Sequence, residues 1–200
     1  MDLVDAAKNL TLDELASVMT HISLHSAYPG STGTNELTGG SPAYARQEVV
    51  WDPAASGVLT TDSAVPSFNV PAGSSVAFAG FWSAATSGTY YGCVPLGPVG
   101  DPHLATVATT GYFTAPGHTF ANGQQVVVSK TLGSLPTGVS NGTVYWVRDV
   151  TGDTFRVAAT SGGSAVSISA AGRAMVRGII VESYGGQGLY AISSLTLSIS

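Results

Sequence analysis

The stretch NGTVYWVRDVTGDTFRVAAT, residues 141–160, has the pattern of a β-hairpin. Side chains in its first half alternate between two faces, with Tyr145 and Val147 on one face and Trp146 on the other. A Thr-Gly-Asp turn at residues 151–153 follows, and the apolar alternation then resumes. Short alternating strands around a glycine-containing turn predict antiparallel pairing. The stretch therefore indicates β-structure in which each strand has one buried face.

The composition extends this prediction to the whole chain of 200 residues. Only 10% of the residues are charged and 44% are hydrophobic, and there are 25 glycines and 10 prolines. Disordered chains have the opposite balance, with much charge and few apolar residues. Many short strands interrupted by glycine and proline turns predict an all-β fold, which we expect to be an antiparallel β-sandwich.

The charge pattern excludes several classes of partner. The net charge is −5, and only seven Lys and Arg residues are present. Binding to nucleic acid or to a membrane surface requires clustered cations, so we expect neither partner. No run of about 18 apolar residues occurs that could span a membrane. Residues 1–10 lack a basic region followed by an apolar run, so we expect no signal peptide and synthesis in a cytoplasm.

Residues 1–28 are the one segment with a helical pattern. Thr11 and Glu14 have the spacing of a capping box, in which each side chain satisfies a free backbone N–H group. Apolar residues then follow at spacings of three and four. This anchor stripe consists of Leu12, Leu15, Met19 and Ile22. A stripe of this kind needs a partner surface, either the chain's own sheets or another protein, and we take it as a candidate assembly anchor.

Two further features predict the domain organisation. A polar, glycine-rich loop spans residues 30–46, and loops of this length are usually functional or clamped by a neighbour. Breaker residues cluster at residues 96–104, before a new series of strands. We therefore expect three parts: a helical segment, a sandwich, and a small β domain inserted into a loop of the sandwich. Their ranges are 1–28, 29–98 with 173–200, and 99–172, respectively.

Residues that could carry chemistry do not form a recognisable site. His21 and His25 have the spacing of a metal pair on a helix, but no third ligand is evident, so hydrogen bonds to a neighbouring loop or subunit are the better interpretation. Cys93 is the single cysteine and lies in an apolar context, which favours a buried small hydrophobe over a reactive thiol. We expect no metal and no cofactor.

Catalytic and calcium-binding motifs are also missing. Asp101 and His103 could belong to a hydrolase triad, but no Gly-x-Ser-x-Gly elbow accompanies them. Asp149 and Asp153 flank a turn and are better explained as turn caps than as calcium ligands, which need more oxygen donors at close spacing. We therefore do not expect an enzyme.

Aromatic residues at strand ends are the remaining candidates for a binding surface. Tyr112 and Trp146 are the two that we single out for surface contact. Aromatic rings in such places are common in sugar-binding surfaces and protein interfaces, and equally common in β cores.

Several short motifs, in order along the chain, resemble a family of tailed-bacteriophage virion proteins. These proteins are described as minor tail or tail-fibre-like proteins and are common in phages of actinobacteria. The matching motifs are HISLHS (21–26), YPG (28–30), TNE (34–36), GGSPAYAR (39–46), VPAG (70–73), AGFWSA (79–84) and GGQGLY (185–190). The segment from Phe113 to Val166 resembles a β module that recurs as an insertion in phage tail and fibre proteins.

The resemblance implies a non-enzymatic structural protein of the virion. Its first interpretation is a minor tail or tail-tip protein that packs against other virion proteins and displays the insert. A capsid decoration protein or head fibre is the alternative, and a carbohydrate-binding module that contacts the host cell wall is a further one. The resemblance also implies a homo-oligomer, with a trimer favoured, and a host cell-surface glycan as a candidate partner.

Overall fold

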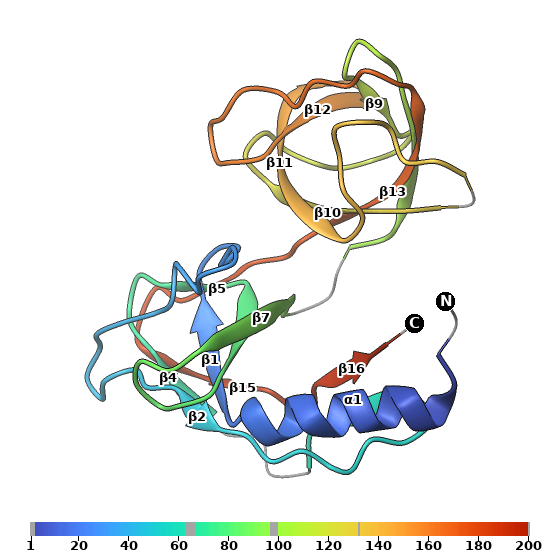
Figure 1. Cartoon of the computed structure of the whole chain (residues 1–200). Coiled ribbons are helices and arrows are strands. Elements are labelled where there is room, and N and C mark those ends of the chain that lie inside the picture. Colours follow the sequence, from blue (N-terminus) through green and yellow to red (C-terminus); the bar gives the residue numbers. More distant parts are fainter. Residues whose placement is uncertain (1–2, 63–66, 97–99, 132, 200) are drawn as a thin grey trace. The chain divides into compact units, whose positions relative to one another are not determined.

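The computed structural model describes residues 3–62, 67–96, 100–131 and 133–199 (Figure 1). The chain divides into two compact units. The sheet unit comprises Met1–Leu96 and Val181–Ser200, and the barrel unit comprises Gly97–Ile180. All strand pairs are antiparallel, and one helix precedes the described strands. The prediction of an antiparallel all-β fold with a short N-terminal helix is thus confirmed.

The N-terminal helix, α1 (Asp5–Val18), is shorter than predicted. It begins before Thr11, whose hydroxyl donates to the carbonyl of Ala7 within the helix, so the predicted capping box is wrong. The chain leaves the helix at Met19, and Ile22 belongs to a strand. The helical spacing of apolar residues continues beyond the true end of α1. It does so because the first strand is buried on both faces and therefore lacks the apolar–polar alternation of an ordinary strand.

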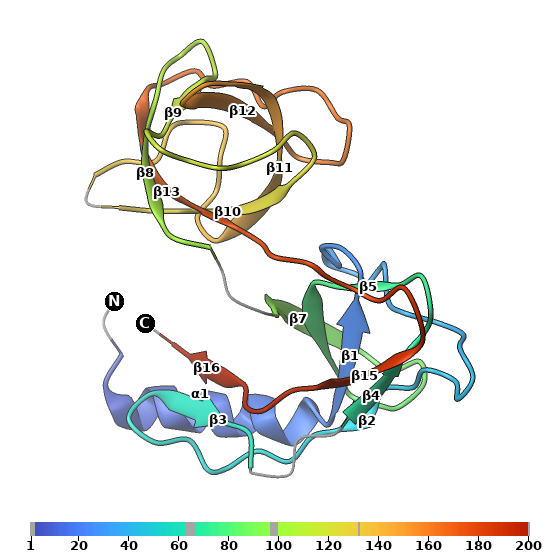
Figure 2. The ribbon, with the colours of Figure 1, turned by 180° about the vertical axis from the view of Figure 1, so that it is seen from behind.

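The sheet unit contains one four-stranded sheet with the order β2-β1-β6-β7. Three two-stranded ribbons, β14-β5, β15-β4 and β16-β3, complete the unit and return the C-terminal segment to it. Figure 2 shows β3 and β16 beside α1. The strands are β1 (His21–His25), β2 (Gln47–Glu48), β3 (Val58–Thr60), β4 (Ser67–Val70), β5 (Ser75–Val76), β6 (Phe78–Trp82), β7 (Tyr90–Pro95), β14 (Glu182–Ser183), β15 (Gly188–Ala191) and β16 (Thr196–Ser198).

One apolar core holds the helix, the sheet and the ribbons of the sheet unit together. Phe68 from a ribbon and Leu24 from the sheet are fully buried in it. Three residues of the anchor stripe, Leu12, Met19 and Ile22, are buried in the same core, and Leu15 packs against it half-buried. The stripe therefore covers the chain's own sheets, which was one of the two surfaces considered for it.

The barrel unit is a closed barrel with the strand order β10-β11-β12-β9-β8-β13. The hairpin of residues 141–160 supplies two neighbouring strands of it. Strand β13 lies within residues that the sequence assigned to the sandwich, so the insert extends to Ile180. The strands are β8 (His103–Val107), β9 (Phe113–Thr114), β10 (Gln125–Ser129), β11 (Thr143–Thr151), β12 (Thr154–Ala158) and β13 (Gly172–Gly178).

The barrel interior is a second, separate apolar core. Tyr145 and Val147 of the hairpin, which the alternation placed on one face, both point into it, and Phe113 stacks on Phe155 with ring centroids 5.4 Å apart. Because the barrel has its own core, its fold does not require side chains from the sheet unit. Within the described part of the chain, no helix has the length and apolar character needed to cross a membrane.

Candidate functional site

The two units each carry one cluster of interacting polar side chains. The first, which we call the Trp82 cluster, lies in the sheet unit where β1 pairs with β6. Ser23 and His25 share one face of β1, and Ser23 lies opposite Gly80 in the register. A Cβ atom at Gly80 would lie 2.5 Å from the His25 ring and 2.6 Å from the Ser23 hydroxyl. Glycine is thus required at this position for the two side chains to meet.

A chain of hydrogen bonds fixes the protonation state of His25. Its Nδ1 atom lies 2.8 Å from the carbonyl oxygen of Thr34, which can only accept, so Nδ1 carries a hydrogen. Its Nε2 atom lies 2.6 Å from the Ser23 hydroxyl, which in turn accepts from Trp82 Nε1 at 2.8 Å. The Ser23 hydroxyl has no other acceptor among the described residues, so we assign its hydrogen to Nε2 and the ring as neutral. Burial lowers the pKa of His25, in agreement with this assignment.

Arg46 closes the Trp82 cluster from the loop side. Its guanidinium lies 3.5 Å from the centroid of the Trp82 ring. It donates from Nε and Nη2 to the two carboxylate oxygens of Glu36 at 2.8 and 2.7 Å. It also donates to the carbonyl of Ser87 at 2.7 Å. The Tyr44 hydroxyl donates to the same carboxylate at 3.4 Å, so the interior of the glycine-rich loop is clamped to its C-terminal end.

The Trp82 cluster contains a serine–histidine pair, but the pair is not built for nucleophilic catalysis. Ser23 and His25 are both 0% exposed, so no substrate reaches them. The second ring nitrogen of His25 faces a backbone carbonyl rather than a carboxylate. His21, its predicted metal partner, bonds instead to the Thr20 hydroxyl. His25 thus bonds to a neighbouring loop through the Thr34 carbonyl, as predicted, whereas the hydrogen bond of His21 is to the residue before it.

The other acidic and histidine candidates also have structural partners. Asp153 accepts from the backbone N–H of Gly117 at 3.0 Å. The ring of His103 packs edge-on against Phe120 at 5.2 Å between centroids. Among the described residues, no three His, Cys, Asp or Glu side chains gather in a way that could hold a metal ion. Cys93 is half-buried in β7, and burial raises the pKa of its thiol.

The second cluster lies on the outer face of the barrel, and we call it the arginine face. It consists of Tyr112, Trp146, Arg148, Asp149 and Arg156. Arg148 of β11 lies directly opposite Arg156 of β12 in the register. Trp146 shares the face of Arg148, and Tyr112 lies under the Arg156 guanidinium at 5.2 Å. The structure thus places the two aromatic residues predicted from sequence on one surface, with two arginines between them.

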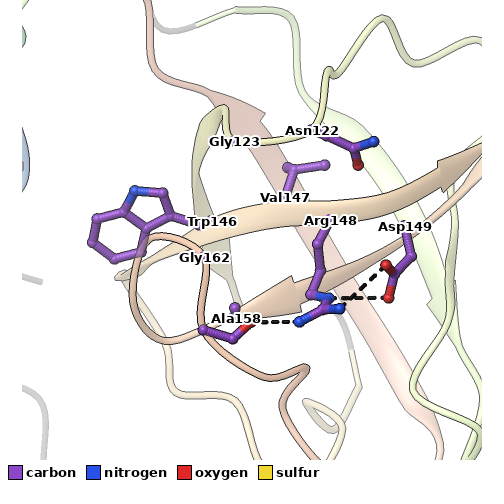
Figure 3. Close-up of a pocket in the computed structure, with 9 residues that line it drawn as sticks. Asn122, Gly123, Trp146, Val147, Arg148, Asp149, Ala158 and Gly162 are labelled. Atoms are coloured by element: carbon purple, nitrogen blue, oxygen red, sulfur yellow. Dashed lines mark hydrogen bonds and ion pairs between the residues drawn. The ribbon is translucent and has the colours of Figure 1, made fainter.

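Asp149 holds the two arginines together. Its carboxylate accepts from Arg148 at 3.0 and 3.3 Å (Figure 3). It also lies 3.8 Å from Arg156 Nη1. These cations lower the pKa of Asp149, with the Arg148 hydrogen bond as the largest cause. Asp149 lies at a β-bulge with φ of +53°, and the bulge turns its side chain toward the arginine pair. Arg148 also donates to the carbonyl of Gly163.

A hollow of about 280 Å³ adjoins the arginine face. Trp146, Arg148 and Asp149 line it from β11, and the loop of Gly162 and Gly163 forms another wall (Figure 3). Sequence reasoning found the aromatic residues but not the arginine pair. The alternation in β11 places Arg148 beside Trp146, whereas its pairing with Arg156 depends on the bulge, which shifts the register by an amount that the sequence does not show.

The neutral state of His25 predicts a pH dependence of stability. Because the folded chain holds the proton less well than the unfolded chain, where the pKa is 6.5, the free energy of unfolding falls as the pH drops below that value. Urea denaturation can follow this in a Trp146→Phe background. The remaining Trp51 and Trp82 both lie in the sheet unit, so fluorescence then reports that unit alone.

Two variants separate His25 from other titrating groups. His25→Gln should be less stable at pH 7 and should lose most of the decline between pH 7 and pH 5. The matched control His21→Gln should keep the decline. An equal decline in both variants would show that another group is responsible.

Because Arg46 contacts both Trp82 and Glu36, we predict that lysine cannot replace it without a loss of stability. Arg46→Lys keeps the charge but loses the planar contact with Trp82 and the paired bonds to Glu36, so we expect a loss of about 2–3 kcal/mol in the free energy of unfolding. Arg173→Lys, on an exposed position of β13, is the matched control and should change stability by less than about 0.5 kcal/mol. An Arg46→Lys variant as stable as this control would contradict the clamp.

Comparison with known proteins gives one match. Residues 10–99 match the family described as podophage GP4 fiber I protein gp80. No curated protein and no solved structure was found to match the chain. The matched segment contains the whole Trp82 cluster and ends where the barrel unit begins. The match supports a structural, fibre-like protein of a phage virion.

Proposed function

We propose that this chain is a non-enzymatic minor tail or tail-tip fibre protein of a tailed phage. In this proposal the sheet unit packs into the particle and the barrel unit is displayed. The observation that carries it is the position of the family match, which covers residues 10–99 and stops at the barrel. The fibre-like part of the chain is thus the sheet unit, and the barrel is an addition carried between β7 and β14.

The distribution of charge supports a division of roles between the units. The barrel unit holds five of the seven Lys and Arg residues and three of the twelve Asp and Glu residues. Its formal charge is therefore +2, and that of the sheet unit is −7. Units of opposite charge favour different partners, because electrostatic complementarity selects which surfaces associate.

Exposed apolar side chains on the sheet unit supply a surface for assembly. Leu10 of α1 is 74% exposed, and Val4, just before the helix, is 70% exposed. Leu10 and Leu15 also line a shallow hollow together with Thr11 and Glu14. Because the buried side of α1 already covers the chain's own core, its outer side is the part left for a partner. We propose a second copy of the chain in a homotrimer, or another virion protein, as that partner.

The alternative proposal is a capsid decoration protein or head fibre, which would use the same two units at another place on the particle. Immunogold electron microscopy of intact particles distinguishes the two, with an antibody raised against the barrel unit. We expect gold at the tail end. Gold spread over the head would favour decoration, and particles that lack the chain altogether would contradict a virion protein of either kind.

The outer side of α1 can be tested by substitution. Leu10→Asp should lower the copy number of the chain in particles severalfold, because it places a charge in an apolar contact. It should leave the stability of the free chain nearly unchanged, since Leu10 is exposed. Quantitative mass spectrometry of purified particles measures the copy number.

A matched control is available on another element of the same unit. Leu189 of β15 is 69% exposed, so Leu189→Asp introduces the same charge at a similar exposure away from the helix. If the two variants enter particles equally well, α1 is not an assembly surface.

A further inference from the structure

We propose that the arginine face of the barrel unit binds an acidic saccharide, meaning a sugar unit that carries a carboxylate or a phosphate group. The inference deepens the proposed function, because it rests on the display of the barrel unit by the particle and names what the barrel meets there. The arrangement of charge, aromatic surface and hollow on β11 and β12 carries it.

The arginine face contains two arginines and one aspartate, so one of its positive charges is not compensated. Like charges directly opposite each other on neighbouring strands repel. Arg148 and Arg156 occupy such positions, and within the described part of the chain Asp149 is the one carboxylate that forms an ion pair with both. Asp149 makes two hydrogen bonds with Arg148, but its nearest approach to Arg156 is 3.8 Å. The group left without full compensation is therefore Arg156.

Arg156 keeps hydrogen-bonding capacity that the described residues do not use. Its Nε atom is buried and has no hydrogen-bond partner among them. Its side chain as a whole is 32% exposed, so the group is not closed off from solvent. The planar guanidinium presents paired N–H donors that match two oxygens of a carboxylate or phosphate. One anionic group at Arg156 would balance the charge of the arginine face.

The remaining surface suits a sugar ring. Tyr112 is 39% exposed beside Arg156, and the partly exposed Trp146 lies at the hollow. Such rings offer an apolar face next to polar groups, which is also the character of a pyranose. The hollow of about 280 Å³ lies at the lower end of ligand pockets, so it fits one or two sugar units rather than a long chain. Gly162 and Gly163 form part of its wall and place no side chain there.

A nucleic acid is a poorer fit to the same surface. Binding to a phosphate backbone uses a row of cations, with each contact releasing counterions. The arginine face has two cations, one of which is already paired, so it offers one anion site. We therefore commit to a saccharide and use a short oligonucleotide as a contrast in the test.

The test is isothermal titration of the full-length chain with matched pairs of probes. Tetragalacturonate and its methyl ester differ only in the carboxylate charge, and maltotetraose with and without a phosphate group differ only in the phosphate. We expect at least one acidic probe to bind tenfold or more tightly than its neutral counterpart. The pair that shows the difference identifies carboxylate or phosphate as the source.

Three variants locate the binding. Arg156→Gln should weaken it at least tenfold. Asp149→Asn should tighten it severalfold, because it removes the competing carboxylate, and asparagine tolerates the positive φ at this position. Arg177→Gln removes the same charge from β13, which lies opposite β12 in the barrel order, and should change nothing. Damage to the fold would weaken binding, so it cannot account for tighter binding in Asp149→Asn.

Several outcomes would overturn the proposal. They are equal affinity for the acidic and neutral probes, equal loss in Arg156→Gln and Arg177→Gln, weaker binding in Asp149→Asn, or tighter binding of a hexanucleotide than of every sugar. Particle incorporation of Arg156→Gln is measured in parallel. Normal incorporation without sugar binding leaves the virion role standing and removes only the saccharide. Absence of the wild-type chain from particles removes the virion role by itself.

Discussion

The contact between the Arg46 guanidinium and the Trp82 indole is the interaction on which the sheet unit depends. Arg46 lies over the face of this ring and binds Glu36, which joins the interior of the long polar loop to its C-terminal end. The N–H at the edge of the indole begins the hydrogen-bond chain through Ser23 to His25. An exposed loop of this composition would cost considerable entropy to order. The cluster offsets that cost with charge-assisted bonds shielded from water, where they are stronger than at an open surface.

Four of the seven motifs that carry the resemblance to phage virion proteins supply groups to this cluster. HISLHS supplies the serine and histidine, TNE the carboxylate, GGSPAYAR the arginine, and AGFWSA the tryptophan and the glycine that makes room. Each motif is short because each contributes one or two groups to a shared network. The similarity over residues 10–99 therefore reports how this unit folds.

Patterns within short stretches of the sequence predicted those elements that depend on interactions between residues close together in the chain. The hairpin at residues 141–160 follows from alternation and a turn, and both act within twenty residues. The end of α1 was misplaced because HISLH is buried on both faces, so the spacing at Ile22 fits a helix as well as a strand. Closure of the barrel joins β8 to β13, about 70 residues apart, through a pairing that no short window contains. The arginine pair depends on the same kind of information, because the bulge between Arg148 and Thr151 sets the register.

Strand topology gives a physical reason for the two units to have different roles. A closed barrel has no free strand edges, so it can be presented to solvent without recruiting other chains through backbone pairing. The four-stranded sheet, by contrast, ends in β2 and β7 among the described strands, and three further ribbons have only two strands each. Unpaired backbone groups at such edges are suited to contacts with neighbouring copies. A unit with open edges and exposed apolar side chains gains from burial in an assembly, whereas the barrel is complete by itself. The chain thus joins a unit with open strand edges to a unit that is a closed barrel.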